Sequence, residues 1–282
     1  MKRLLLLATL LCATLSAGAQ TAADSLAIVS AKWTTHSPQK GVTLKSALIG
    51  DLYNGAQSIN LVEISRSSKL HLAVAHDNNM RRTSAMASDK GAVAAINGTF
   101  YNMREGNSTC FYKIDREVID STTTSEAASR VNGAVHISGR KLSILDWTPD
   151  IERSYKGNKG TVLASGPVML DEGGYADWSK CSESFIKTKH PRSAIYTTRD
   201  GKVVFITVDG RSAGNAAGVS IEELAHLIRV LGGYDALNLD GGGSTTLWIK
   251  DAPENGVVNY PCDNRKFDHA GERSVSNCIY AY

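Results

Sequence analysis

One stretch decides how the chain is organised: Ala236-Leu237-Asn238-Leu239-Asp240-Gly241-Gly242-Gly243-Ser244-Thr245-Thr246-Leu247-Trp248-Ile249. Its apolar beginning predicts a strand that enters a core and ends at Asp240, and residues 247–249 predict a second strand. Three consecutive glycines lose much backbone entropy on ordering, and a plain turn does not need them. Glycines also let backbone N–H groups approach a ligand closely. We therefore expect Asp240, these N–H groups and the hydroxyls of residues 244–246 to face one small volume. A plain glycine-rich hairpin is the alternative.

The composition indicates an ordinary globular protein. Of the 282 residues, 42% are hydrophobic and 21% are charged, and the formal net charge is +3. These values are typical of soluble proteins, and so small a charge, without a basic run, gives no reason to expect nucleic acid as a partner. The sequence contains no long linker and no repeat. We therefore expect α+β architecture, a single compact domain with a mixed β-sheet flanked by few helices.

The first 19 residues have the pattern of a signal peptide. A positive pair at the N-terminus precedes apolar residues 4–15, and small residues at 17–19 offer a cleavage site. The apolar run is too short to cross a bilayer. We expect an exported protein, periplasmic or extracellular, without an integral membrane segment. Residues 20–60 would then be a lead-in segment with a strand, before a domain of residues 61–282.

Four cysteines follow the predicted signal peptide, and an even number in an exported chain suggests disulfides. Four cysteines allow three connectivities. Cys262 and Cys278 are close in sequence and bracket a polar loop, so we favour the pairs Cys262–Cys278 and Cys110–Cys181. Their spacing fits no zinc pattern. Free buried thiols are the alternative.

Two further strands end, like the opening one, at polar residues. Residues 203–208 form a continuous apolar run, which predicts a central strand buried on both faces, and this run ends at Asp209-Gly210-Arg211. A small apolar strand ends at Asn97-Gly98, although Asn-Gly is also a strong hairpin signal. Another strand opens at His190-Pro191-Arg192. Ligands often meet a fold at the ends of its strands, so these groups are candidates for one site.

A helix is predicted between the central strand and the opening stretch. Ser220 is its expected N-cap, and Glu223 lies three residues later, which is the capping-box spacing. Strand, helix and strand together predict a right-handed crossover with Asp209 and Asp240 at corresponding strand ends. Glu223 either belongs to the site or only caps its helix.

The polar groups at these strand ends suit two kinds of chemistry. Two arginines beside glycine-rich backbone suit a phosphate, because a guanidinium offers two parallel hydrogen bonds. Carboxylates in the same place suit either sugar hydrolysis or a divalent metal. No cysteine–histidine set points to zinc. Each residue alone also has a structural explanation: Asp209 can cap a turn, and Arg211 can pair with it.

Several short motifs occur in a fixed order along the chain: Ala95–Tyr101, His190–Arg192, Val208–Arg211, Ser220–Ala225 and Asn238–Thr246. Together they resemble the phosphodiester glycosidase family, which includes the lysosomal enzyme that uncovers mannose 6-phosphate. No single motif is specific, but their combination is. The resemblance covers residues 90 to 282 and does not extend to the residues before 60.

The resemblance implies hydrolysis of a sugar-1-phosphodiester at the anomeric carbon, with an N-acetylglucosamine-type sugar in a surface glycan or teichoic-type polymer. A phosphate monoester is a good leaving group, so arginines would stabilise its charge while a carboxylate acts at the sugar. The catalytic candidates are Asp209, Glu223 and Asp240, which the sequence does not order. The substrate-binding candidates are Asn97, Gly98, His190, Arg192, Gly210, Arg211, Asn238, Gly241, Gly242, Gly243, Ser244 and Thr245.

Two other functions fit the same residues. A metal-dependent phosphodiesterase would cut the P–O bond with Asp209 and Asp240 as metal ligands. A non-catalytic protein would bind phosphorylated glycan through the same groups. No cofactor is certain from the sequence: a divalent cation is possible, and its ligands are unknown.

Overall fold

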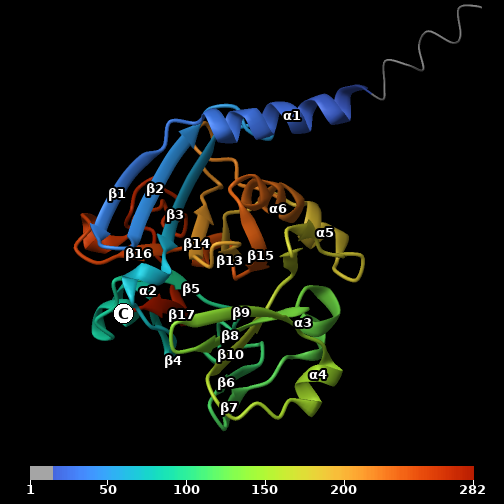
Figure 1. Ribbon diagram of the computed structural model, residues 1–282, viewed down its shortest axis with the longest axis vertical. Helices are drawn as coiled ribbons and strands as arrows, with labels where there is room; N and C mark the ends of the chain where they lie inside the picture. The colour runs from blue at the N-terminus through green and yellow to red at the C-terminus, as the bar shows by residue number, and fades with distance from the viewer. Residues whose placement is uncertain (1–14) are drawn as a thin grey trace, which may run out of the picture.

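The strand predicted to lie at the centre of the sheet, β14 (Val203–Val208), is buried along its whole length in the computed structural model, which describes residues 15–282 (Figure 1). It belongs to an eight-stranded sheet. In order across that sheet, the strands are β1 (Thr34–Gln39), β2 (Val42–Ile49), β3 (Gln57–Ile64), β14, β13 (Arg192–Thr198), β15 (Gly233–Asn238), β11 (Val168–Asp171) and β12 (Gly174–Tyr175).

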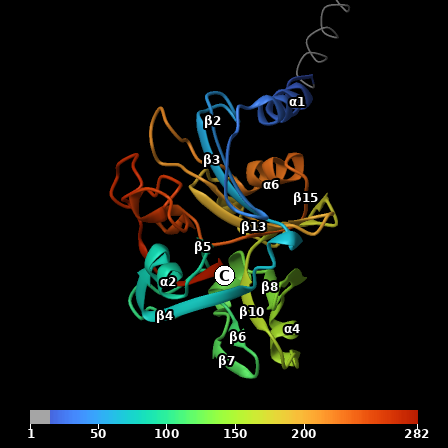
Figure 2. The ribbon, with the colours of Figure 1, turned by 60° about the vertical axis from the view of Figure 1, so that its left-hand side comes forward.

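Two smaller sheets pack beneath the large one, as Figure 2 shows from a second side. The main hydrophobic core lies between all three, with Val62, Ile96 and Leu163 as one buried residue from each sheet. The five-stranded sheet has the order β7 (Glu117–Asp120), β6 (Tyr112–Ile114), β10 (Thr161–Ser165), β8 (Gly133–Ser138) and β9 (Lys141–Asp146). The four-stranded sheet has the order β16 (Leu247–Ile249), β5 (Ala94–Asn97), β17 (Ser274–Ala281) and β4 (Leu72–Arg82).

The helix α6 (Ile221–Val230) covers the outer face of the large sheet, and α1 (Leu15–Ser30) packs against α6 through its C-terminal part, which includes the buried Ile28 (Figure 1). The predicted capping box begins α6: the Ser220 hydroxyl accepts from the Glu223 N–H at 3.1 Å, and the Glu223 carboxylate accepts from the Ser220 N–H at 2.8 Å. The other helices and 3-10 turns are short: α2 (Thr83–Asp89), α3 (Thr124–Ser129), α4 (Pro149–Ser154), α5 (Glu183–Lys187), η1 (Arg66–Ser68), η2 (Gly242–Ser244) and η3 (Glu254–Gly256).

The predicted fold class, a single α+β domain with few helices, is confirmed, and the structure adds that its strands divide among three sheets. Both β14 and β15 pair antiparallel with β13, which lies between them, so they run in the same direction. Asp209 and Asp240 therefore follow corresponding strand ends, as predicted. The segment between β11 and β13 carries β12 and α5.

The predicted disulfides are wrong, because the four cysteines in the described part of the chain are free thiols. Each favoured pair is divided between separate packing regions. Cys110 is buried in a cluster on the five-stranded sheet, whereas Cys181 packs against the cluster beneath α6. Cys278 is buried beneath α2, whereas Cys262 lies half-buried in a loop. Burial raises the pKa of both the Cys110 and the Cys278 thiols to about 12, which keeps them protonated.

Most of the predicted signal peptide, residues 1–14, lies outside the described residues. Within residues 15–282, no helix is both long enough and apolar enough to cross a membrane.

Candidate active site

Strands of two sheets end together around Asp240. The Asp240 N–H donates to the Gly98 carbonyl at 3.0 Å, which joins the loop after β15 to the end of β5. The fully buried Asn97 amide donates to the Asp240 carbonyl at 2.7 Å, and its oxygen accepts from the Ser193 hydroxyl at 2.6 Å and the Thr246 N–H at 3.1 Å. Asn97 and Gly98, predicted as substrate ligands, thus hold the backbone of Asp240 in place.

The glycine run makes room for two arginines. Gly242 has a φ of +62°, and a Cβ there would lie 3.1 Å from Arg211 Nη2. A Cβ on Gly243 would overlap the guanidinium of Arg273. The Gly242 N–H donates to the Pro191 carbonyl at 2.8 Å, so this donor serves the fold. The side chains that the glycines lack would occupy the place of the guanidinium groups.

The carboxyl group of Asp240 has an unusual proton affinity. Burial raises its pKa to about 6, while a hydrogen bond from Ser244 and the positive charges of Arg130 and Arg273 limit the rise. A carboxyl group with this pKa is mostly ionised at neutral pH but can still exchange a proton. A pKa near the working pH is the property expected of a catalytic acid or base.

Two of the neighbouring arginines were not predicted from the sequence. Arg130 follows α3, where Nε and Nη2 donate to Glu126 at 2.5 and 2.7 Å, and its guanidinium lies 3.7 Å from the centre of the Phe100 ring. Arg273 immediately precedes β17, and its Nε donates to Asp263 at 3.0 Å. These partners fix the direction of both guanidinium groups.

The two predicted arginines lie beside them. Arg192 is only 2% exposed and donates to the carbonyls of Phe185, Thr188 and Val219. Burial lowers its pKa to about 10, so the group stays charged at neutral pH, and the charges of Arg130, Asp240 and Arg211 act on it. Arg211 is exposed.

His190 lies beside Arg211, with 3.4 Å between its Nδ1 and Arg211 Nη2. Burial, followed by the charges of Arg192 and Arg211, lowers its pKa. His190 is therefore neutral at neutral pH, and it can accept a hydrogen bond or donate one to an anion.

Asp209 lies in a different environment from Asp240. It directly follows β14, which runs in the same direction as β15. It is 1% exposed. One carboxylate oxygen accepts from Ser58 Oγ at 2.6 Å and Asn60 Nδ2 at 3.3 Å, and the other accepts from Asn259 Nδ2 and the Tyr260 N–H, both at 2.9 Å. These bonds occupy the roughly four lone-pair positions of a carboxylate. Asp209 therefore joins β3, β14 and the loop after β16, and it has no position left for a ligand.

The carboxylate of Glu223 is also engaged. One oxygen completes the capping box of α6, and the other pairs with Lys189 Nζ at 2.9 Å. Its charge still reaches Arg192, whose pKa it raises. Of the three predicted catalytic carboxylates, the geometry leaves Asp240 the most available.

The remaining predicted residues divide between the site and the fold. Ser244 is buried and hydrogen-bonds to Asp240 and Tyr101. Asn238 donates to the carbonyls of Gly166 and Leu239 inside the sheet.

The buried Thr245 hydroxyl has no hydrogen-bond partner among the described residues. Gly210 and Gly241 pack closely on the backbone of Pro191, where a Cβ on either would lie within 2.9 Å.

A cavity of about 300 Å³ opens beside this site. Arg130, Phe185 and His190 line it together with three serines and a threonine. Sequence reasoning missed Arg130 and Arg273 because each comes from a segment without a site-like pattern, and it did not single out Tyr101 within the motif Ala95–Tyr101. The one available signal was the aromatic pair after Gly98, which includes Tyr101.

Comparisons with known proteins identify the family and the fold. A sequence model of the family described as phosphodiester glycosidase matches residues 90–282. The bovine N-acetylglucosamine-1-phosphodiester alpha-N-acetylglucosaminidase is 27% identical over 191 residues, which cover 63% of this chain and 34% of that protein. This chain thus matches about a third of the length of its curated relative.

Two solved structures share the fold. The catalytic domain of zebrafish N-acetylglucosamine-1-phosphodiester alpha-N-acetylglucosaminidase, auto-inhibited by its pro-peptide, superposes with a TM-score of 0.67 at 15% identity, covering 89% of this chain and 87% of that one. A hypothetical protein from Synechocystis superposes with a TM-score of 0.61 at 17% identity, covering 89% and 63%. The family model matches more than half of this chain, and the chain therefore belongs to the phosphodiester glycosidase family.

Proposed function

We propose that this protein hydrolyses sugar-1-phosphodiesters at the anomeric carbon. The observation that carries the proposal is one half-buried carboxyl group of pKa about 6, Asp240, whose charge interacts with Arg130, Arg192 and Arg273 and whose glycine loop contacts Arg211. Membership of the family supports the reaction class. The names of the relatives favour N-acetylglucosamine as the sugar, and the N-terminal sequence pattern supports export to the periplasm or the medium.

The arginines would bind the phosphate. A phosphodiester carries one negative charge, and the departing monoester gains a second when the C1–O bond breaks. Arg192 and Arg273 are held by carbonyls or by an acid, so they need little reorganisation as this charge develops. Preoriented charge of this kind stabilises the transition state more than the ground state. Arg130 and Arg211 would complete the set.

Asp240 would act at the sugar. When the C1–O bond breaks, its electron pair leaves with the phosphate, and the anomeric carbon becomes positive. An ionised carboxylate can stabilise this carbon, either by bonding to it or by taking a proton from the attacking water. Water finally supplies the oxygen on C1, and its proton passes to the carboxylate and then to solvent. Both routes require Asp240 to be ionised, and Ser244, Arg130 and Arg273 favour that form.

Asp209 and Glu223 would support the site from outside it. Asp209 fixes the loop after β16, and Glu223 fixes the start of α6 close to Arg192. The alternative of a metal-dependent phosphodiesterase needs Asp209 as a ligand. Its lone pairs are already occupied, so this alternative has less support than the glycosidase.

The test is a product assay on the methyl phosphate diester of α-N-acetylglucosamine. The proposal expects free N-acetylglucosamine and methyl phosphate, with or without a chelator. Asp240→Asn should lower the rate by at least about 10³-fold, because removal of a catalytic carboxylate has effects of that order. The matched control is Asp171→Asn, which alters an exposed acid on β11 of the same sheet.

Each other outcome identifies a different function. N-acetylglucosamine 1-phosphate that disappears with the chelator would establish the metal-dependent phosphodiesterase. An Asp240→Asn variant with full activity would remove Asp240 from the reaction. Substrate that binds without turnover, equally well in the variant, would indicate a phosphoglycan-binding protein.

A further inference from the structure

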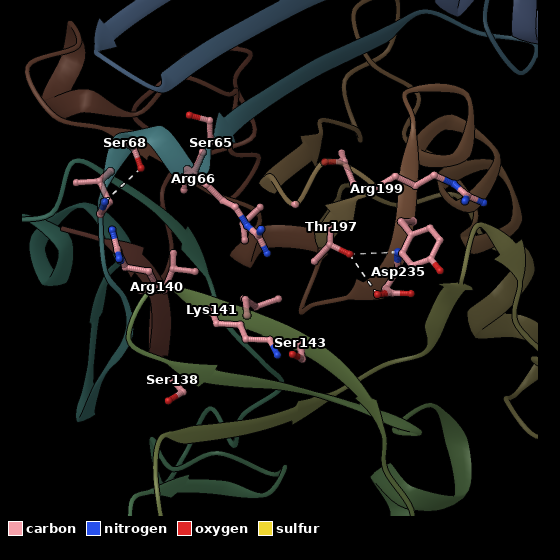
Figure 3. Close-up of a pocket in the computed structure, with 18 residues that line it drawn as sticks. Ser65, Arg66, Ser68, Ser138, Arg140, Lys141, Ser143, Thr197, Arg199 and Asp235 are labelled. Carbon is pink, nitrogen blue, oxygen red and sulfur yellow. Dashed lines mark hydrogen bonds between the residues drawn. The ribbon is translucent and has the colours of Figure 1, made fainter.

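A second and larger cavity lies at the opposite end of the large sheet from Asp240. Its volume is about 760 Å³. Its walls come from η1, the turn between β8 and β9, the end of β13 and the start of β15, as Figure 3 shows. The buried residues Ile64, Leu142 and Val203, which belong to the main core, form part of its floor. The cavity is thus built on rigid elements and has the size of ordinary ligand sites, about 300–1,000 Å³.

Four cationic side chains line this cavity: Arg66, Arg140, Lys141 and Arg199. None of the four forms an ion pair with any acid among the described residues, whereas Lys202 nearby pairs with Glu63 at 3.5 Å and Asp200 at 3.6 Å. Their charges are therefore available to a ligand.

The single acid in the wall is Asp235, and it is partly occupied. One of its oxygens accepts from the Glu172 N–H at 3.0 Å, and the other accepts from the Thr197 hydroxyl at 3.3 Å. The lining therefore carries an excess of three positive charges. A neutral ligand would leave this excess uncompensated, and an anionic ligand would neutralise it.

The cations are directed by their surroundings. Arg66 lies over Gly201, where a Cβ would be only 2.8 Å from its Nε, so the missing side chain leaves space for the guanidinium. Arg199 lies over the ring of Tyr234, 5.0 Å from its centre. Figure 3 shows Arg66 entering the cavity from η1, with Lys141 and Ser143 on the opposite wall. The charges thus line two walls of one space.

The rest of the polar lining consists of hydroxyl groups. Six serine and threonine side chains contribute: Ser65, Ser68, Ser138, Ser143, Thr197 and Thr198. Cations with many hydroxyls match a ligand that itself carries both anions and hydroxyl groups. A saccharide with phosphate or carboxylate substituents has this chemistry, whereas the flat surface of a membrane does not fit a cavity between two sheets.

We propose that this cavity binds an anionic saccharide segment, at a site separate from Asp240. The two sites occupy opposite ends of β13, which is about 20 Å long at roughly 3.4 Å per residue. A short phosphodiester reaches only the site at Asp240, and a polymer reaches both. This part of the proposal rests on the proposed function: when the polymer is the substrate, the cavity is a second binding site that increases the affinity for long chains.

The primary test measures binding and needs no turnover. The probe is a fluorescent, phosphate-substituted dextran oligosaccharide, measured by anisotropy at low salt. The variant Arg66→Ala/Arg140→Ala/Lys141→Ala should bind about tenfold or more weakly, since three exposed charge contacts of modest size are lost together. The matched control, Arg116→Ala/Lys156→Ala/Lys159→Ala, removes the same charge from exposed residues elsewhere and should change the affinity less than about twofold.

Several outcomes overturn the proposal. Equal weakening in the two triple variants would show unspecific attraction by net charge. Equal binding of neutral dextran would show that the charges are irrelevant, and tighter binding to phosphatidylglycerol vesicles would replace the saccharide with a membrane. Polygalacturonate, compared with the phosphorylated dextran, distinguishes carboxylate from phosphate as the recognised anion. If the triple variant unfolds, Lys141→Gln alone must still weaken binding.

A kinetic test separates this proposal from the proposed function. With a polymeric sugar phosphodiester, the triple variant should show a raised KM and an unchanged kcat, while its kinetics on the methyl phosphate diester should equal those of the wild type. If neither substrate is hydrolysed by the wild type, the proposed function fails, but the binding result stands. Equal KM values on the polymer would refute the role of the cavity in substrate attachment.

Discussion

The ends of β14 and β15 look alike in the sequence and differ in the structure. Both strands run in the same direction, and each is followed by an aspartate and a glycine, Asp209-Gly210 and Asp240-Gly241. Asp209 accepts four hydrogen bonds from neutral groups. Asp240 accepts from Ser244 and from the Gly241 N–H, and the positive charges of Arg130 and Arg273 act on it. A carboxylate with neutral donors on every side is a structural joint, whereas one among cations is suited to meet an anionic substrate.

Burial alone does not distinguish the two aspartates. Burial raises the pKa of both carboxyl groups. The difference lies in their partners and exposure: the lone pairs of Asp209 are occupied, whereas Asp240 keeps some exposed surface and interacts with Arg130 and Arg273.

The first prediction concerns the structural carboxylate. Asp209→Ala leaves the donors of Ser58, Asn60, Asn259 and Tyr260 without their acceptor inside the protein. Unsatisfied buried groups are costly, so the free energy of unfolding should fall by about 3–5 kcal/mol. Urea denaturation measures the change, with Asp171→Ala at an exposed position as the control. A loss below about 1 kcal/mol would contradict the structural role.

The second prediction concerns Asp240, whose replacement should raise the free energy of unfolding rather than lower it. The ordinary pKa of 3.8 rises to about 6 in the folded protein, so the folded state binds the proton more tightly between these values. Stability is therefore lost as the pH rises from about 4 to about 6, and the loss remains at higher pH. Two pKa units correspond to roughly 3 kcal/mol.

Asp240→Asn should remove this cost. At pH 8 the variant should be more stable than the wild type, by at most about 3 kcal/mol, and near pH 4 the two should be equal. Thermal unfolding at both pH values measures the difference. A variant that is less stable at pH 8 would show that the arginines and Ser244 stabilise the ionised carboxylate more than burial destabilises it.

The third prediction concerns the cations around Asp240. Arg130→Gln and Arg273→Gln should each lower kcat/KM on the methyl phosphate diester by about 100-fold, the order of effect seen when a donor to a developing oxyanion is removed. Both arginines lower the pKa of Asp240, so their loss should also raise it. The acid limb of the pH profile, expected near pH 6 in the wild type, should move to higher pH.

Arg116→Gln, at an exposed position between β6 and β7, is the control and should keep the wild-type profile. If kcat/KM fell 100-fold and the acid limb of the pH profile did not move, the arginines would act on the phosphate and not on the pKa of Asp240. No loss of activity would remove them from the site.

The sequence predicted the parts of this arrangement that depend on neighbouring residues. The buried run of β14, the capping box of Ser220 and Glu223 and the strand ends at Asp209 and Asp240 all follow from local patterns, and all are present. What distinguishes the two aspartates is not local. Arg130 and Arg273 reach Asp240 only because the loops after α3 and before β17 fold to the same place.

The wrong disulfide prediction has a similar cause. The short spacing between Cys262 and Cys278 in the sequence suggested a bond between them. In the structure, Cys278 is buried in the hydrophobic cluster beneath α2. Likewise, the identical charge of three carboxylates could not show which of them already had partners. Partner choice depends on tertiary contacts, so pattern reasoning identified the rim of the sheet but left the order of its acids open.

The last and smallest effect is expected at Glu223, the third acid of the predicted set. Glu223→Gln keeps an oxygen for the Ser220 N–H and loses only the ion pair with Lys189, a partly exposed contact. Such pairs contribute about 0–1 kcal/mol, so both stability and kcat should change little, kcat by less than about threefold. Steady-state kinetics on the methyl phosphate diester would measure this. A loss of kcat comparable to that of Asp240→Asn would mean that Glu223 leaves its helix cap when substrate binds, and that two carboxylates share the reaction.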